Sequence, residues 1–128
     1  MAPAGLIQPT DDTVSRSRRK LHRAVIAYDK AAAALCDTLN RDDAEQDDAE
    51  IQMDQVQLVK DEAFNTFDDL IEMFEKAPIT DDNDKVIADL ETDRREKQFL
   101  WLRVTRDFDK KFFPKKKPQA EETEEEEA

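Results

Sequence analysis

Between Pro9 and Pro114 the chain contains one proline, Pro78, and no glycine. Glycine and proline are the residues that let a backbone turn sharply or that end a regular element. A β-sheet protein needs such turn residues every few positions, so this stretch argues against a sheet. The sequence therefore predicts an all-α fold, built from two blocks, 10–77 and 79–113, on either side of the central proline.

Apolar residues recur at helical spacing through residues 11–39 and mark one face of a first helix. Thr10, followed by Asp11 and Asp12, is a good N-cap with acidic residues that complement the helix dipole. The core-facing residues predicted for this helix are Val14, Leu21, Val25, Tyr28, Ala32, Leu35 and Leu39.

Residues 40–48 (NRDDAEQDD) decide whether the first block bends. Asn40 is suited to the left-handed position that ends a helix, and Asp43 with Gln46 three residues later resembles a capping box. These signals favour a tight turn and an antiparallel hairpin, with a second helix over 43–76. The alternative is one rod of about 65 residues, roughly 100 Å long, which would leave its apolar stripe exposed. The expected stripe of the second helix is Met53, Val56, Ala63, Phe64, Phe67, Leu70, Ile71 and Phe74.

A third helix is expected over 81–112. Pro78 ends the second helix, because the residue before a proline avoids helical geometry, and Thr80 offers a new cap. Three helices of similar length predict an elongated antiparallel hairpin or three-helix bundle. The alternative is a two-helix hairpin whose third helix leaves to meet another molecule. The apolar face of the third helix, which Arg94 and Lys97 interrupt, consists of Val86, Ile87, Leu90, Trp101, Val104, Phe108 and Phe112.

The chain divides into three parts. We expect residues 1–9 to be a flexible arm, 10–113 to form one helical domain and 114–128 to be a disordered, charged tail. The longest apolar run, 31–36, is far shorter than the roughly 20 residues that span a membrane. The single cysteine, Cys36, cannot form an internal disulfide, which favours a cytoplasmic setting.

Residues that carry catalytic or metal chemistry are scarce. The only histidine is His22, which argues against a dimetal bundle built on Glu-x-x-His pairs. The acidic residues 81–84 lack the glycine and glutamate of a calcium loop, and no glycine follows Gly5 to build a phosphate loop. His22 and Cys36 would lie about 21 Å apart on one helix, too far to act as a catalytic pair. We therefore expect no enzymatic activity, no metal and no cofactor.

The net charge of −12 is unevenly distributed along the chain. Residues 37–93 hold twenty acidic and four basic side chains, whereas residues 94–117 hold ten basic and three acidic ones. Residues 118–128 add six glutamates. Such a chain can attract an oppositely charged partner or another copy of itself.

The segment 94–117 (RREKQFLWLRVTRDFDKKFFPKKK) is the predicted working surface, because its aromatic residues occupy more than one side of the helix. Phe99 lies almost opposite Trp101, and a helix that is apolar on most sides is normally buried on most sides. Either this end packs unusually deeply or it contacts a partner, and tryptophan, phenylalanine and arginine are favoured interface anchors. The predicted partner-binding residues are Phe99, Trp101, Arg103, Arg106, Phe108, Phe112 and Phe113.

The function expected from these features is a non-catalytic helical assembly or adaptor protein. It would self-associate as a homo-oligomer or bind a larger protein assembly through its basic aromatic helix. Viral scaffolding and capsid-assembly proteins are also small, highly charged and helical, with charged tails. By this analogy, the protein would be found in host cytoplasm or in a virion. Two alternatives remain open. One is an acidic DNA mimic acting through residues 37–93, and the other is a nucleic-acid-associated factor using residues 94–117.

Overall fold

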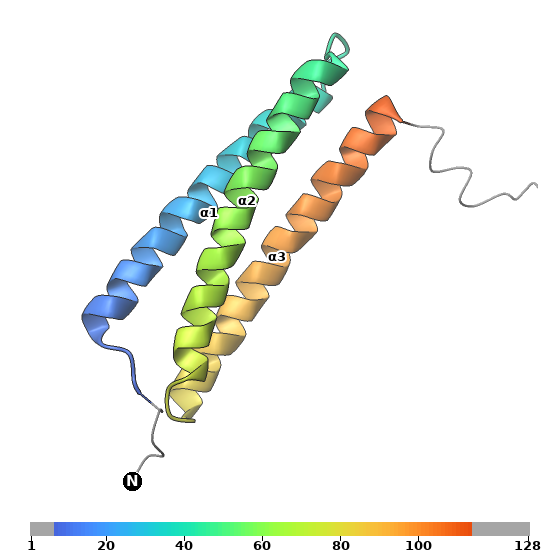
Figure 1. The fold of residues 1–128 in the computed structure, drawn as a ribbon. Helices are drawn as coiled ribbons and strands as arrows, with labels where there is room; N and C mark the ends of the chain where they lie inside the picture. The colour runs from blue at the N-terminus through green and yellow to red at the C-terminus, as the bar shows by residue number, and fades with distance from the viewer. Residues whose placement is uncertain (1–6, 114–128) are drawn as a thin grey trace, which may run out of the picture.

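The computed structural model describes residues 7–113, which form three helices joined by two short connections (Figure 1). The helices are α1 (Asp11–Leu39), α2 (Gln46–Glu75) and α3 (Asp81–Phe112). Figure 1 shows them lying side by side as an elongated antiparallel bundle. The predicted all-α, three-helix architecture is therefore confirmed. The expected disordered tail, 114–128, and the first six residues of the expected arm lie outside the described residues.

Threonine caps begin two of the helices, as predicted. Thr10 Oγ1 accepts a hydrogen bond from the backbone N–H of Thr13 at 3.2 Å. Thr80 Oγ1 accepts one in the same way from the backbone N–H of Asn83 at 3.1 Å. Aspartates follow both caps in the first turn, where their charge stabilises the positive end of the helix dipole.

The α1–α2 connection forms the hairpin expected from the sequence, but its local geometry differs from the prediction. Asn40 ends α1 in the right-handed region, with φ −84° and ψ −7°, and not in the left-handed one. The capping box expected at Asp43 is absent from this connection, and α2 begins at Gln46, after a Glu45 N-cap that makes no side-chain cap bond. Gln46 is thus the first residue of α2 and not the third, and its side-chain amide donates a hydrogen bond to the Glu50 carboxylate at 3.0 Å.

The α2–α3 connection is fixed by a buried asparagine. Asn83 is 4% exposed, and its side-chain amide donates to the backbone carbonyl oxygen of Pro78 at 2.8 Å. The same amide exchanges two hydrogen bonds with the side chain of Gln8, and the backbone N–H of Ile7 donates to the carbonyl oxygen of Lys76. The segment before α1 is thus bonded to the turn between the other two helices.

The core consists of two clusters stacked along the bundle. One lies toward the α1–α2 connection and includes Tyr28, Leu35, Val56, Val104 and Phe108. The other lies toward the α2–α3 connection and includes Leu21, Phe67, Leu70, Phe74 and Leu90. Every residue predicted for an apolar face is buried or half-buried, so the helical periodicity identified the core correctly.

The two basic residues that interrupt the apolar face of α3 are paired with aspartates of the other helices. Lys97 Nζ lies 2.9 Å from the carboxylate of Asp29 on α1. Arg94 bonds the carboxylate of Asp68 on α2 through two nitrogens, at 2.8 and 3.3 Å, and its guanidinium lies 4.6 Å from the centre of the Phe64 ring. These contacts let α3 pack on both neighbours despite the charges on its inner side.

Candidate protein-interaction surface

The aromatic residues of α3 are divided between the inside and the outside of the bundle. Trp101 is half-buried against the core, and Lys60 Nζ of α2 lies 4.7 Å from its ring centre. Phe108 is 7% exposed and its ring centre lies 5.1 Å from that of the half-buried Phe112. Of the predicted partner-binding residues, these three therefore contribute mainly to packing.

The remaining predicted residues lie on the solvent side of α3. Phe99 is 56% exposed, and Arg103 and Arg106 are also exposed. Phe113 is 39% exposed, at the end of the helix, with its ring centre 6.2 Å from that of Phe108. The predicted set is thus split, and only part of it forms a surface that a partner can reach.

Two further residues complete this surface. Leu102 is 47% exposed and follows Phe99 by three residues, while Arg95 precedes Phe99 by four. Residues three and four apart share one face of a helix. We use the term outer face of α3 for this surface, which consists of Arg95, Phe99, Leu102, Arg103 and Arg106. Helical spacing from Phe99 was the signal that could have identified Leu102 and Arg95 from the sequence.

The arginines of the outer face differ electrostatically from the basic residues on the inner side of α3. Arg94 and Lys97 are held by aspartates, as described above. Within residues 7–113, none of Arg95, Arg103 and Arg106 forms an ion pair. The outer face therefore presents two exposed apolar side chains among three arginines that are free to pair with acidic groups.

One titratable group lies close to this surface. Cys36 of α1 lines a groove of about 470 Å³ between α1 and α3, together with Asp107 and Lys110. Burial raises the pKa of the Cys36 thiol, the charges of Asp107 and Asp37 raise it further, and Arg103 lowers it. A raised thiol pKa favours the unreactive protonated form.

In the part of the chain that the structure describes, no three histidine, cysteine, aspartate or glutamate side chains are grouped so that they could hold a metal ion. None of the described helices is long and apolar enough to cross a membrane. Comparisons of the chain with protein-family models, curated proteins and solved structures find no match.

Proposed function

We propose that the protein is a non-catalytic helical assembly or adaptor protein that binds a protein partner through the outer face of α3. The observation that carries this proposal is the exposure of Phe99 and Leu102, 56% and 47%, on one face with arginines that form no ion pair among residues 7–113. Arginine and aromatic residues are enriched among the side chains that dominate binding energy at protein interfaces. A cytoplasmic setting belongs to the same proposal.

An acidic protein surface suits this face better than nucleic acid does. The three arginines of the outer face can form paired hydrogen bonds with carboxylates, while Phe99 and Leu102 fill apolar pockets. A large acidic excess in residues 37–93, which include α2 and the first part of α3, repels a phosphate backbone.

The test compares capture of partners from a lysate of the protein's own cells by the full chain and by Phe99→Ala. We expect this substitution to lower the recovery of a partner about tenfold or more, because truncating a buried interface aromatic removes much of the binding energy. Ile79→Ala is the matched control, since Ile79 is 86% exposed and lies outside the outer face. The free energy of unfolding should change little in either variant.

Charge reversal provides an independent arm of the same test. Arg103→Glu with Arg106→Glu should abolish capture, whereas Lys85→Glu, near the other end of α3, should not. Recovery that disappears on nuclease treatment would instead favour the nucleic-acid-associated factor. The proposal is wrong if Phe99→Ala unfolds the chain, or if capture survives both changes to the outer face.

A further inference from the structure

A second exposed surface lies along the outer groove between α1 and α2. Part of this groove is a hollow of about 350 Å³, lined by Lys20, Arg23 and Ala27 of α1 and by Val59 and Glu62 of α2. No residue of α3 lines this hollow, so the surface is separate from the outer face of α3. Along this groove, α1 and α2 each contribute one regularly spaced row of exposed residues.

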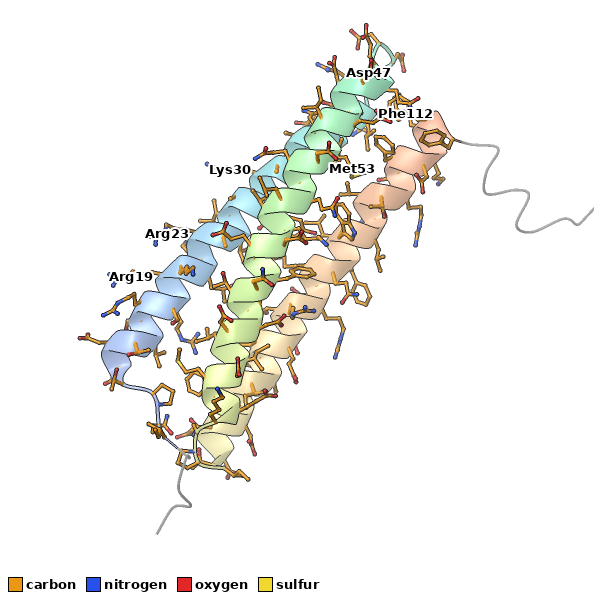
Figure 2. The ribbon with its side chains drawn as sticks, viewed as in Figure 1. Arg19, Arg23, Lys30, Asp47, Met53 and Phe112 are labelled. Carbon is orange, nitrogen blue, oxygen red and sulfur yellow. The ribbon has the colours of Figure 1, made fainter. Side chains whose placement is uncertain are left out.

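On α1, residues spaced alternately four and three apart form a continuous outer row. All six are exposed, and Figure 2 shows Arg23 and Lys30 projecting from α1 away from α3. Alternating steps of four and three are the spacing of helices that pack along a seam. The α1 row consists of Arg16, Lys20, Arg23, Ala27, Lys30 and Ala34.

On α2, a second row has the same spacing and is also exposed at every position. Its two large apolar members, Ile51 and Leu58, are 68% and 67% exposed and lie seven residues apart. Large apolar side chains repeated at this interval on a solvent-facing side are typical of a contact surface. The α2 row consists of Ile51, Gln55, Leu58, Glu62, Asn65 and Asp69.

The two rows are complementary at one end in charge and at the other end in apolar character. Lys20 lines the groove together with Glu62 and Asp69, so the basic part of the α1 row lies level with the acidic part of the α2 row. Because α1 and α2 are antiparallel, Ala34 at the other end of its row lies toward Ile51. In the described residues no ion pair joins Lys20 or Arg23 to the α2 row.

We propose that this surface binds a second copy of the chain, as a two-fold dimer whose symmetry axis runs parallel to the helices. Such an axis places the α1 row of one copy against the α2 row of the other at the same level, and the reverse contact follows by symmetry. Lys20 and Arg23 then lie against Glu62 and Asp69 of the second copy, while Leu58 lies against Ala27. Opposite charges therefore face each other in both symmetry-related halves of the interface.

The other two-fold arrangement is disfavoured by charge. An axis perpendicular to the helices would place α1 against α1 and α2 against α2. The basic α1 row would then face another basic row, and Glu62 and Asp69 of α2 would lie against Leu58 and Ile51 of the second copy. Like charges at close range and carboxylates in an apolar contact are both destabilising. Charge complementarity therefore determines the orientation of the dimer, and burial of Ile51 and Leu58 supplies its apolar contact.

The contact is modest in size. Each row spans about 27 Å along its helix, and two helices side by side make a face about 20 Å wide. This area lies at the low end of that found in stable dimers, so we expect a dissociation constant in the micromolar range.

Sedimentation velocity of the full chain over a concentration series tests the proposal. The wild type should shift from monomer to dimer, and Leu58→Lys should raise the dissociation constant about tenfold or more, because it places a positive charge in the apolar contact, opposite the basic α1 row. Leu102→Lys is the matched control, since Leu102 is similarly exposed but lies on the outer face of α3. It should leave the dimer unchanged, which separates this inference from the proposed function.

A charge-swap experiment tests the orientation. Lys20→Glu with Arg23→Glu places acidic side chains against Glu62 and Asp69 of the second copy, and Glu62→Lys with Asp69→Lys places basic side chains against Lys20 and Arg23, so each variant alone should stay monomeric. An equal mixture should restore a dimer containing one copy of each, because both contacts are then between opposite charges. Native mass spectrometry distinguishes this mixed dimer by mass.

Several results would overturn the proposal. A wild type that stays monomeric at high concentration excludes the dimer. Binding of a duplex oligonucleotide by such a monomer through Lys20 and Arg23 would assign the basic row to nucleic acid. A dimer that is lost in Leu102→Lys but kept in Leu58→Lys would assign association to α3. Failure of the mixed charge variants to associate would exclude the parallel two-fold arrangement.

Discussion

The hydroxyl of Tyr28 on α1 donates a 2.8 Å hydrogen bond to the backbone carbonyl oxygen of Lys97 on α3. Tyr28 is fully buried, and the next residue along α1, Asp29, accepts a bond from the ammonium of the same Lys97 at 2.9 Å. Two adjacent residues of α1 therefore hold both the backbone and the side chain of one residue of α3. This double contact fixes where α3 lies along α1.

Tyr28→Phe should lower the free energy of unfolding by about 1 kcal/mol, because it removes this hydrogen bond and leaves the ring in place. Urea unfolding followed by the fluorescence of Trp101, the single tryptophan, measures the change. The slope with urea should stay constant, since the area exposed on unfolding is unchanged. An unaltered midpoint would mean that the hydroxyl bond makes no net contribution.

Alkaline pH should destabilise the protein through the same side chain. Burial, and then the charge of Asp29, raises the pKa of the Tyr28 phenol well above its ordinary value, which is about 10. The folded state then holds the proton more tightly than the unfolded state does. This contribution to stability is complete below pH about 10 and is lost as the pH rises through the folded-state pKa.

Tyr28 is the only tyrosine, so phenolate absorbance reports this group alone. Titration should show ionisation that coincides with unfolding, and the stability of Tyr28→Phe should fall less steeply above pH about 10. Free ionisation near pH 10 in the folded protein would contradict the burial of the hydroxyl.

Asn83→Ala should cost about 1–3 kcal/mol, because it leaves the Pro78 carbonyl and the Gln8 amide without their buried partner. Gln8→Ala should cost less, since it removes the paired amide but keeps the bond to Pro78. Thermal unfolding of the two variants gives both values. Equal losses would show that the bond to Pro78 contributes little.

Arg94→Lys should cost roughly 0.5–1 kcal/mol, because lysine cannot reproduce the two-nitrogen contact with Asp68 or lie flat over Phe64. Arg95→Lys, on the exposed neighbouring position, is the control and should change the stability by less than about 0.5 kcal/mol. Chemical unfolding of both variants decides the matter, and similar values for the two would contradict the special role of Arg94.

The thiol of Cys36 should react slowly with iodoacetamide at neutral pH, because burial and nearby carboxylates raise its pKa. Asp107→Asn should lower that pKa and speed alkylation, whereas Arg103→Ala should raise it and slow alkylation further. Mass spectrometry of timed samples gives the rates. The electrostatic account is wrong if the two substitutions change the rate in the same direction.

The helices and their inner faces could be predicted because local chemistry and packing agree there. Pro78 and Thr80 place the second connection, and the apolar spacing selects the buried residues. The first connection was harder, since the residues at Asn40 and Asp43 each allow more than one local geometry. At this connection the packing of α1 against α2 determines the backbone geometry. A hydrogen bond from Lys111 Nζ to the Arg41 carbonyl oxygen also joins the connection to α3.

The candidate surfaces were less predictable for a different reason. Helical spacing distinguished Phe99 from the apolar face of α3. Whether Trp101 and Phe108 are exposed to a partner, however, depends on how closely the other helices pack against α3. The outer rows of α1 and α2 contain mostly polar and charged residues, so a search for apolar stripes does not find them. Only the antiparallel alignment of the two helices shows that Lys20 lies level with Glu62.

Because residues 7–113 form three helices, the bundle separates the first of these residues from the last. Ile7 is bonded beside the α2–α3 connection, whereas Lys111, near the end of α3, contacts Arg41 at the opposite connection. The helices hold 29, 30 and 32 residues, so these two points are separated by about 45 Å of rigid structure. Groups bound at these two points are therefore kept apart by the length of the bundle, and any force between them is carried along the helix axes.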